Sequence, residues 1–333
     1  MISNKRWMFV LPPYGAARLV AIKTADAFLE KVGPQVFWTF DTLNYLQSFS
    51  KLLTTYDENL VTDLTNQSLI VSCFDFEITH LITTALCPVT LFTLGLLRKH
   101  NISTIHWFYE DYRRALYWKD VISGYDHFCS IQKSDFQTIC QTYKTKYHFL
   151  STASSFQKTD SLQNQKIKYD LAFIGIPSTY RICFLEKLLS EGFRIIIAGS
   201  GWQSYSGPLE NSILYKQWTN DTQMKEIFLQ SRIGLNLSVE DPTGRADVHI
   251  SPRVYDIVAC GNILLTEDVP LIYDSLPECW YFTFKCVDDA CSKIRQLLKP
   301  VENESKKIEK NKQIIFDNHT YAHRVEELIS FCL

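Results

Sequence analysis

A chain of 333 residues is longer than one hydrophobic core usually supports, so two domains of about 150 residues each are expected. Hydrophobic residues make up 46% of the chain and charged residues 21%, a composition that argues against intrinsic disorder. The formal net charge of −2 gives no global signal for nucleic acid or for an anionic membrane as a partner.

Apolar runs in the chain are short. The run at Trp7–Leu11 is too short for a signal-peptide core, and the longest run, Leu86–Leu97, falls below the ~18 residues of a membrane span. We therefore expect a cytoplasmic protein with at most peripheral contact at the inner face of a membrane. The ten cysteines form no C-x-x-C pair and mostly lie within apolar runs, which favours buried thiols over disulfides or a zinc site.

The first half of the chain alternates short apolar runs with helix-length segments such as Leu19–Lys31 and Pro88–His100. The runs are nearly continuous rather than alternating, which is typical of parallel strands buried on both faces. This order predicts a doubly wound α/β domain. The expected strands are Trp7–Leu11, Val36–Phe40, Leu69–Phe74, Thr104–Phe108 and His127–Ile131.

A polar segment rich in Ser and Gln, Ser151–Lys166, interrupts this alternation and is the best linker candidate. After it, helices and strands alternate again, which predicts a second domain of the same class. We expect an N-terminal domain at 1–160, a C-terminal domain at 167–316, and a terminal helix at 317–333 that packs back toward the N-terminal domain. The expected strands of the second domain are Leu171–Gly175, Arg194–Ala198, Ile213–Gln217, Ile233–Leu237 and Ile263–Thr266.

Two such domains facing each other would form a cleft, and ligands of open α/β sheets bind beyond the carboxyl ends of strands. The first strand ends in "LPPYGAARLVA", where Gly15 opens a helix whose backbone N–H groups can approach an anion or a sugar. A tight turn that uses the free φ angle of glycine explains the same residue equally well.

The fourth expected strand ends in "IHWFYEDYRRALYW", which places Glu110 and Asp111 among aromatic side chains. Such acids can hold sugar hydroxyls or accept a proton, with pKa values set by partial burial. In the alternative interpretation, Asp111 caps the next helix and the aromatic residues belong to the core.

In the second domain, Gly175 ends a strand and Arg181 follows in the first helical turn, where a guanidinium can clamp a diphosphate. The next strand ends in "AGSGW", in which Gly199 and Gly201 permit close backbone approach and Trp202 can line a site. Loop glycines without a ligand are the alternative.

The stretch "ISPRVYDIVACGNILLTED" reads as a helix followed by a strand, with Pro252 in the first helical turn. Arg253 at the positive helix N-terminus is unfavourable unless an anion joins it, which predicts a phosphate site. Asp256 lies one turn further and can accept hydrogen bonds from sugar hydroxyls. The alternative is a weak surface ion pair between Arg253 and Asp256.

Near the C-terminus, His319 and His323 have the i, i+4 spacing of metal ligands on one helix, but no third ligand accompanies them. We expect no metal site there.

These motifs together resemble the CgeB-like glycosyltransferases of the GT-B class, first named for a spore-maturation protein. The resemblance covers nearly the whole chain through "LPPYG", "HWFYEDYRRALYW", "YDLAFIG" with "AGSGW", "SPRVYDIVACGNILLTED" and "HTYAHR". It implies two Rossmann-like domains, a nucleotide-sugar donor held mainly by the C-terminal domain, and no obligatory metal or other cofactor. It places Arg181 and Arg253 at the diphosphate, the Gly199–Trp202 loop near the base or ribose, and Asp256 where the family usually has Glu.

The expected function is therefore transfer of a sugar from a nucleoside diphosphate to a glycan, lipid-linked or protein acceptor, with Glu110 or Asp111 as base or acceptor-orienting group. Related retaining enzymes carry a Glu-x7-Glu pattern, and here Val248 stands eight positions before Asp256. This departure motivates an alternative, a non-catalytic nucleotide- or sugar-binding module. A nucleotide-sugar epimerase of related fold is a third interpretation.

Overall fold

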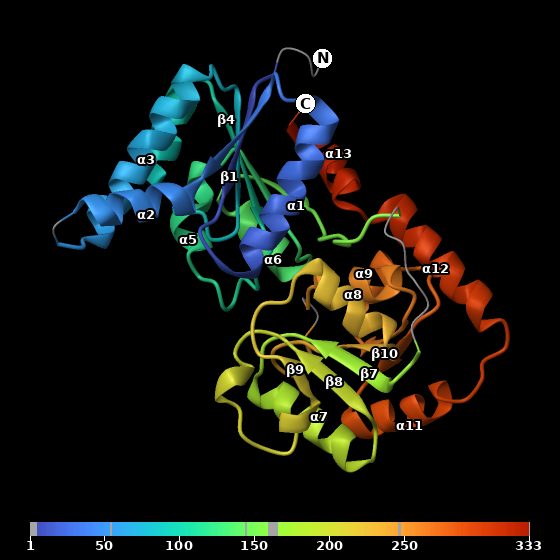
Figure 1. Cartoon of the computed structure of the whole chain (residues 1–333). Helices are drawn as coiled ribbons and strands as arrows, with labels where there is room; N and C mark the ends of the chain where they lie inside the picture. The colour runs from blue at the N-terminus through green and yellow to red at the C-terminus, as the bar shows by residue number, and fades with distance from the viewer. Residues whose placement is uncertain (1–4, 54, 144, 159–165, 246–247, 333) are drawn as a thin grey trace. The chain divides into compact units, whose positions relative to one another are not determined.

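The computed structural model describes residues 5–53, 55–143, 145–158, 166–245 and 248–332 (Figure 1). The chain forms two compact units: unit 1 comprises Met1–Thr152 with Tyr321–Leu333, and unit 2 comprises Ala153–Thr320. The chain thus leaves unit 1 after Thr152 and returns to it at Tyr321, whereas the sequence suggested boundaries at 160 and 317.

Unit 1 contains a six-stranded parallel sheet with the strand order β2-β1-β3-β4-β5-β6. Because β1 connects toward β2 while β3 connects toward β4, the loops after β1 and β3 diverge and leave a topological switch point between these strands. The strands are β1 (Trp7–Leu11), β2 (Phe37–Asp41), β3 (His80–Thr84), β4 (Ser103–Phe108), β5 (His127–Ser130) and β6 (Lys146–Phe149).

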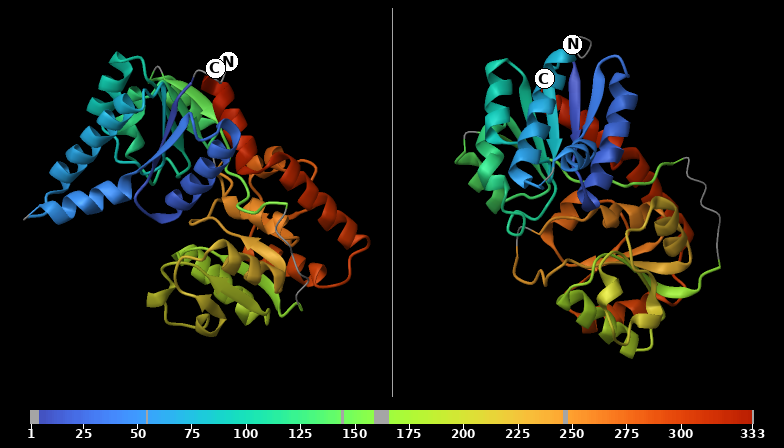
Figure 2. Two further views of the ribbon diagram at one scale, coloured as in Figure 1. Left: turned by 45° about the horizontal axis from the view of Figure 1, so that its top comes forward. Right: turned by 60° about the vertical axis from the view of Figure 1, so that its left-hand side comes forward.

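Helices cover both faces of this sheet (Figure 2). The C-terminal helix α13 packs against α1, so the last segment of the chain completes unit 1. The helices are α1 (Gly15–Val32), α2 (Thr42–Leu52), α3 (Glu58–Asp75), α4 (Leu91–Lys99), α5 (Trp118–Val121), α6 (Asp135–Gln141) and α13 (Tyr321–Cys332), with a 3-10 turn at Ile122–Gly124.

The strand expected at Leu69–Phe74 is wrong, because this segment lies in α3. The helix is capped by Asp57, whose carboxylate accepts hydrogen bonds from two backbone N–H groups of the first turn. Leu69 and Cys73 are buried and Val71 is exposed, which is the helical spacing of a half-buried face. The strand at this place in the sheet is His80–Thr84, whose Ile and two Thr residues are β-branched.

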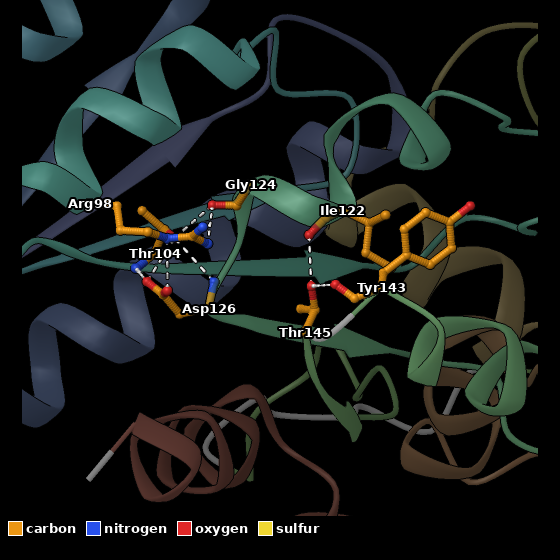
Figure 3. A network of polar contacts seen from close by, with 7 residues as sticks. All are labelled: Arg98, Thr104, Ile122, Gly124, Asp126, Tyr143 and Thr145. Atoms are coloured by element: carbon orange, nitrogen blue, oxygen red, sulfur yellow. Dashed lines mark hydrogen bonds and ion pairs between the residues drawn. The ribbon is translucent and has the colours of Figure 1, made fainter.

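A polar network braces the amino ends of β4 and β5 (Figure 3). Asp126 Oδ2 accepts hydrogen bonds from Thr104 N at 2.9 Å and Thr104 Oγ1 at 3.0 Å. Asp126 Oδ1 accepts one from Arg98 Nε at 3.1 Å, and Arg98 Nη2 also reaches Gly124 O at 2.8 Å. One carboxylate therefore joins the end of α4 to the starts of two strands.

Unit 2 contains a second six-stranded parallel sheet with the order β12-β11-β10-β7-β8-β9. Its switch point lies between β7 and β10, because β7 connects toward β8 and β10 connects toward β11. The five strands expected here from the sequence are confirmed within a few residues. The strands are β7 (Tyr169–Ile174), β8 (Ile195–Ala198), β9 (Ile213–Tyr215), β10 (Ser231–Asn236), β11 (Ile263–Glu267) and β12 (Phe282–Phe284).

The helices of unit 2 form a layer on each face of the sheet (Figure 1). Helix α7 packs with α11, and α9 packs with α12. The helices are α7 (Thr179–Ser190), α8 (Asp221–Leu229), α9 (Pro252–Ala259), α10 (Pro270–Ser275), α11 (Val287–Leu297) and α12 (Glu304–Asn318), with 3-10 turns at Trp202–Ser204 and Glu210–Ser212.

Two further sequence expectations concern composition. Within the described residues, no helix has both the length and the apolar character needed to cross a bilayer. Six of the ten cysteines are buried as thiols, in agreement with their positions in apolar runs, while Cys183 and Cys286 are exposed.

Replacing Asp126 by Ala should lower the free energy of unfolding by about 1–2 kcal/mol, because a backbone N–H and a guanidinium lose their acceptor. Urea denaturation of the full chain measures the effect. The matched control is Asp120→Ala, which removes an exposed acid from α5. Equal losses in the two variants would contradict a bracing role for Asp126.

Candidate functional site

The switch point of unit 2 brings two arginines to one glycine. Gly175 follows β7, Arg181 lies in the first turn of α7, and Arg253 is the second residue of α9. A Cβ atom at Gly175 would lie 2.9 Å from Arg253 Nη2 and 3.3 Å from Arg181 Nη1. The absence of a side chain at Gly175 therefore allows two guanidiniums from opposite helical layers to flank the end of one strand.

Arg181 is 4% exposed and binds the ends of two strands. Its guanidinium donates to Ile176 O at 2.9 Å, to Leu237 O at 2.7 Å and to Ser238 O at 3.0 Å. It also lies over the ring of Phe173, 5.3 Å from the centroid. Arg181 thus joins the loop after β7 to the end of β10 and leaves a positive charge at the switch point.

Arg253 makes a similar bridge from α9. Ser251 caps this helix by accepting a hydrogen bond from the backbone N–H of Arg253, and Pro252 occupies the first helical position. The side chain donates from Nε to Ile174 O and from Nη1 to Asn236 Oδ1 at 2.7 Å. Burial lowers the pKa of Arg253 to about 10. Within the described residues, Nη2 donates no hydrogen bond, so it can bind a ligand beside β7.

Asp256 is buried and faces a different part of unit 2. Its Oδ1 accepts hydrogen bonds from Ser155 N at 2.7 Å and from Ser154 Oγ at 3.1 Å. Burial raises the pKa of Asp256 to about 7, although these two hydrogen bonds and the charge of Arg253 act in the opposite direction. No ion pair between Arg253 and Asp256 is present in the described part of the chain, so the alternative of a surface pair does not fit this geometry.

The two serines belong to the segment expected as a linker, Ser151–Lys166, of which residues 159–165 lie outside the described residues. Ser154 is buried and its backbone N–H donates to His319 O at 2.9 Å. From Ala153 on, the first residues of this segment are therefore part of the packed structure of unit 2. Its Ser-rich composition resembled that of a solvated linker, and the contact with Asp256, about a hundred residues later, has no local sequence signal.

The loop after β8 packs directly on the end of β7. Gly199 has φ +146°, and a Cβ atom there would lie 2.3 Å from Gly175 O, so this position requires glycine. Gly201 has φ +93°. Trp202 does not line a site as expected: it is fully buried and its Nε1 donates to Gly175 O at 2.8 Å. The large indole ring is buried in the core instead of lining a site, because its N–H is satisfied there by a backbone carbonyl.

The remaining candidates belong to unit 1. Gly15 is the first residue of α1, has φ +76°, and has open space where a Cβ would lie. Glu110 follows β4, and burial raises its pKa, with Arg114 opposing the shift and Asp111 adding to it. Asp111 Oδ1 accepts a hydrogen bond from Arg113 N at 2.9 Å and so stabilises a turn, whereas the next helix begins only at Trp118.

The histidine pair does not share a helix. Helix α12 ends at Asn318 and α13 begins at Tyr321, so His319 lies in the break. Its ring stacks on Tyr255, with centroids 5.1 Å apart and an interplanar angle of 26°. Among the described residues, no three His, Cys, Asp or Glu side chains form a group that could hold a metal ion.

The buried carboxyl of Asp256 should make stability depend on pH. Since its pKa is raised to about 7 in the folded state, the wild type should lose stability relative to Asp256→Asn as the pH rises from 4 to 8, by an amount on the order of 3 kcal/mol. Urea-denaturation curves of both proteins across this range measure the difference. Ser154→Ala removes a hydrogen bond that lowers the pKa of Asp256. In this variant, the pH at which half of the stability difference is lost should therefore be higher. A difference that does not vary with pH would contradict the prediction.

Comparisons with known proteins agree with this architecture. Residues 181–330 match the model of a family described as glycosyl transferase-like. Three solved structures have similar folds. An α,α-trehalose 6-phosphate synthase from Burkholderia multivorans has a TM-score of 0.60 and 9% identity, and the alignment covers 98% of each chain. A glycosyltransferase involved in avilamycin A biosynthesis has a TM-score of 0.57 and 10% identity over 98% of this chain and 96% of the other, and a UDP-N-acetylglucosamine 2-epimerase has a TM-score of 0.58 and 12% identity over 99% of this chain and 95% of the other. Among curated proteins, no sequence matches this chain. Residues 181–330 are thus similar to a glycosyl transferase-like family, and the two Rossmann-like units together have the GT-B fold of the solved glycosyltransferases.

Proposed function

We propose that the protein is a glycosyltransferase that moves a sugar from a nucleoside-diphosphate sugar to a glycan, lipid-linked or protein acceptor. The observation that carries the proposal is the pair of guanidiniums beside Gly175 at the switch point of unit 2, with Arg253 Nη2 available to an anion. The glycosyl transferase-like match supports it, because residues 181–330 include both arginines. The finer assignment, to the CgeB-like family, is also a proposal and rests on the motifs of the sequence.

The two arginines would stabilise the charge that develops on the leaving diphosphate. Arg253 lies at the N-terminus of α9, where the helix dipole repels a cation and attracts an anion, so a bound diphosphate would relieve an existing electrostatic cost. Donors held in place before the reaction need no reorganisation in the transition state. Because this role falls to arginines, we propose that the reaction requires no metal ion.

We propose roles for the other candidates in the same way. Gly175 would leave room for the diphosphate, and the backbone of the loop at Gly199 and Gly201 would border the nucleoside. Asp256 would accept hydrogen bonds from sugar hydroxyls through Oδ2, because Oδ1 already accepts hydrogen bonds from Ser154 and Ser155.

On unit 1, Gly15 would border the acceptor, and Glu110 or Asp111 would be the base or acceptor-orienting group. Of the two acids, the structure favours Glu110. Its pKa is raised by burial, as proton transfer near neutral pH requires, whereas the carboxylate of Asp111 stabilises a turn. We further propose that the protein works in the cytoplasm, with at most peripheral membrane contact, and that nucleic acid is not a partner.

Nucleotide binding is the first test. Isothermal titration with UDP, GDP, ADP, CMP and dTDP should show binding of at least one, and Arg253→Ala should weaken it about tenfold or more, as expected for loss of a hydrogen bond to a charged group. The matched control is Arg194→Ala, which removes a largely exposed arginine paired with Asp170. If a folded sample bound none of the five, or if Arg253→Ala bound as well as the wild type, the diphosphate role would be excluded.

Turnover is the second test. Nuclear magnetic resonance should detect slow hydrolysis of the donor that binds, or its transfer in cell extract, and excess EDTA should leave the rate unchanged. Glu110→Gln should lower the rate about a hundredfold with little change in donor affinity, because general base catalysis contributes at the transition state.

A second candidate function is a nucleotide- or sugar-binding module without turnover. Two observations favour it: the carboxylate of Asp256 is already bonded within the protein, and Val248 is a buried hydrophobic residue. Binding without turnover of any donor would support this alternative. An isomerised sugar formed without an acceptor would instead indicate an epimerase.

A further inference from the structure

Unit 2 contains a cavity that none of the candidate residues above lines. It has a volume of about 420 Å³ and opens at the carboxyl ends of β11 and β12, beside the first turn of α7 and the loop that follows β10. We call it the β11–β12 cavity. Residues that line it include Tyr180, Asp241, Arg245, Glu267, Asp268 and Phe284. Its volume is in the range of small-molecule sites, which are typically about 300–1,000 Å³.

A buried acid is built into its wall. Glu267 is 3% exposed, and Ser238 donates to its carboxylate from both the backbone N–H and the hydroxyl, each at 2.8 Å. Tyr180 lines the same wall, and burial raises the pKa of Glu267 while the hydrogen bonds from Ser238 act in the opposite direction. Ser238 thus holds the carboxylate in place, and the hydroxyl of Tyr180 adds a second polar group to the same wall.

The cavity wall carries both signs of charge, with Asp241, Glu267 and Asp268 alongside Arg245 and Lys285. Acids and bases both line it, and Asp268 lies 3.9 Å from the ammonium of Lys285 while its other oxygen accepts from Tyr273 at 2.6 Å. A wall with both signs of charge does not select a strongly charged ligand. It does supply acceptors and donors for hydroxyl groups, while Phe284, Tyr180 and two prolines supply apolar surface.

We propose that the β11–β12 cavity binds one neutral saccharide ring. A pyranose has both features that these walls match, a set of hydroxyl groups and apolar C–H faces. Ser238 joins the cavity to the arginines: its carbonyl accepts from Arg181 Nε at 3.0 Å, and its N–H donates to Glu267. The ring is either the glycosyl group of a donor whose diphosphate lies at the arginines or the terminal sugar of an acceptor. The donor assignment rests on the proposed function.

Two arms of one experiment separate these sources. In the first, titration calorimetry compares UDP with UDP-glucose and GDP with GDP-mannose. If the cavity holds the donor sugar, the sugar nucleotide binds about tenfold more tightly than its parent nucleotide, and Asp268→Asn or Tyr180→Phe removes most of that advantage without changing nucleotide affinity. In the second arm, saturation-transfer resonance detects methyl glucoside and methyl mannoside on nucleotide-saturated protein. A signal lost in the same variants, with no effect in the first arm, identifies an acceptor sugar.

Asp288→Asn is the matched control, because it removes an exposed acid of α11 that does not line the cavity. Tyr180→Phe keeps the shape of the side chain, and circular dichroism verifies the fold of each variant. If neither arm responds to either variant, the proposal is overturned even where nucleotides bind. If no nucleotide binds the wild type, the proposed function fails, and the second arm, run without nucleotide, still decides whether the cavity takes a saccharide.

Discussion

Two guanidiniums hold the carboxyl ends of β7 and β10 together, and the arrangement of the other loops at this edge of unit 2 depends on them. Arg181 and Arg253 come from helices on opposite faces of the sheet, yet both bind strand-end carbonyls at the point where the chain direction diverges. Taking a charged group out of water costs several kcal/mol, and neutral carbonyls offset only part of that cost. The lowered pKa of Arg253 reflects the part of this desolvation cost that the carbonyls do not offset. An anion at this place would complete an arrangement that the fold already maintains at a cost.

The same arrangement connects neighbouring features. Ser238 accepts from one arginine and donates to Glu267, while Gly175 accepts from the buried Trp202 and lies against Gly199. The carboxyl ends of the central strands are thus held by hydrogen bonds between loops. By contrast, the ends of the sheet in unit 1 shown in Figure 3 are braced by Asp126 at the amino side, away from the edge where α/β ligands bind.

Much of this fold could be predicted from the sequence, because continuous apolar runs and glycine-ended strands are local signals. The wrong strand prediction at Leu69–Phe74 also has a local cause. A largely apolar run of six residues is too short for its pattern to distinguish a strand from the buried face of a helix. The helix N-terminus at Arg253 was predictable from Ser251 and Pro252, whose preferences are intrinsic. What could not be predicted were partners distant in sequence, such as Ser154 for Asp256, and the burial of Trp202, which depends on a carbonyl from another strand.

Gly175 and Gly199 carry different kinds of information about the history of the protein. A side chain at Gly199 would strike a backbone carbonyl, so any descendant that still folds must retain glycine there. A side chain at Gly175 would meet the buried ring of Phe173 and the ends of two arginines, so glycine there serves both the core and the positive charges. Among diverging descendants, persistence of the first residue records survival of the architecture. Loss of the second would require Phe173 and the two arginines to move apart, and so would mark lineages in which the positive charge at this strand end has been rearranged.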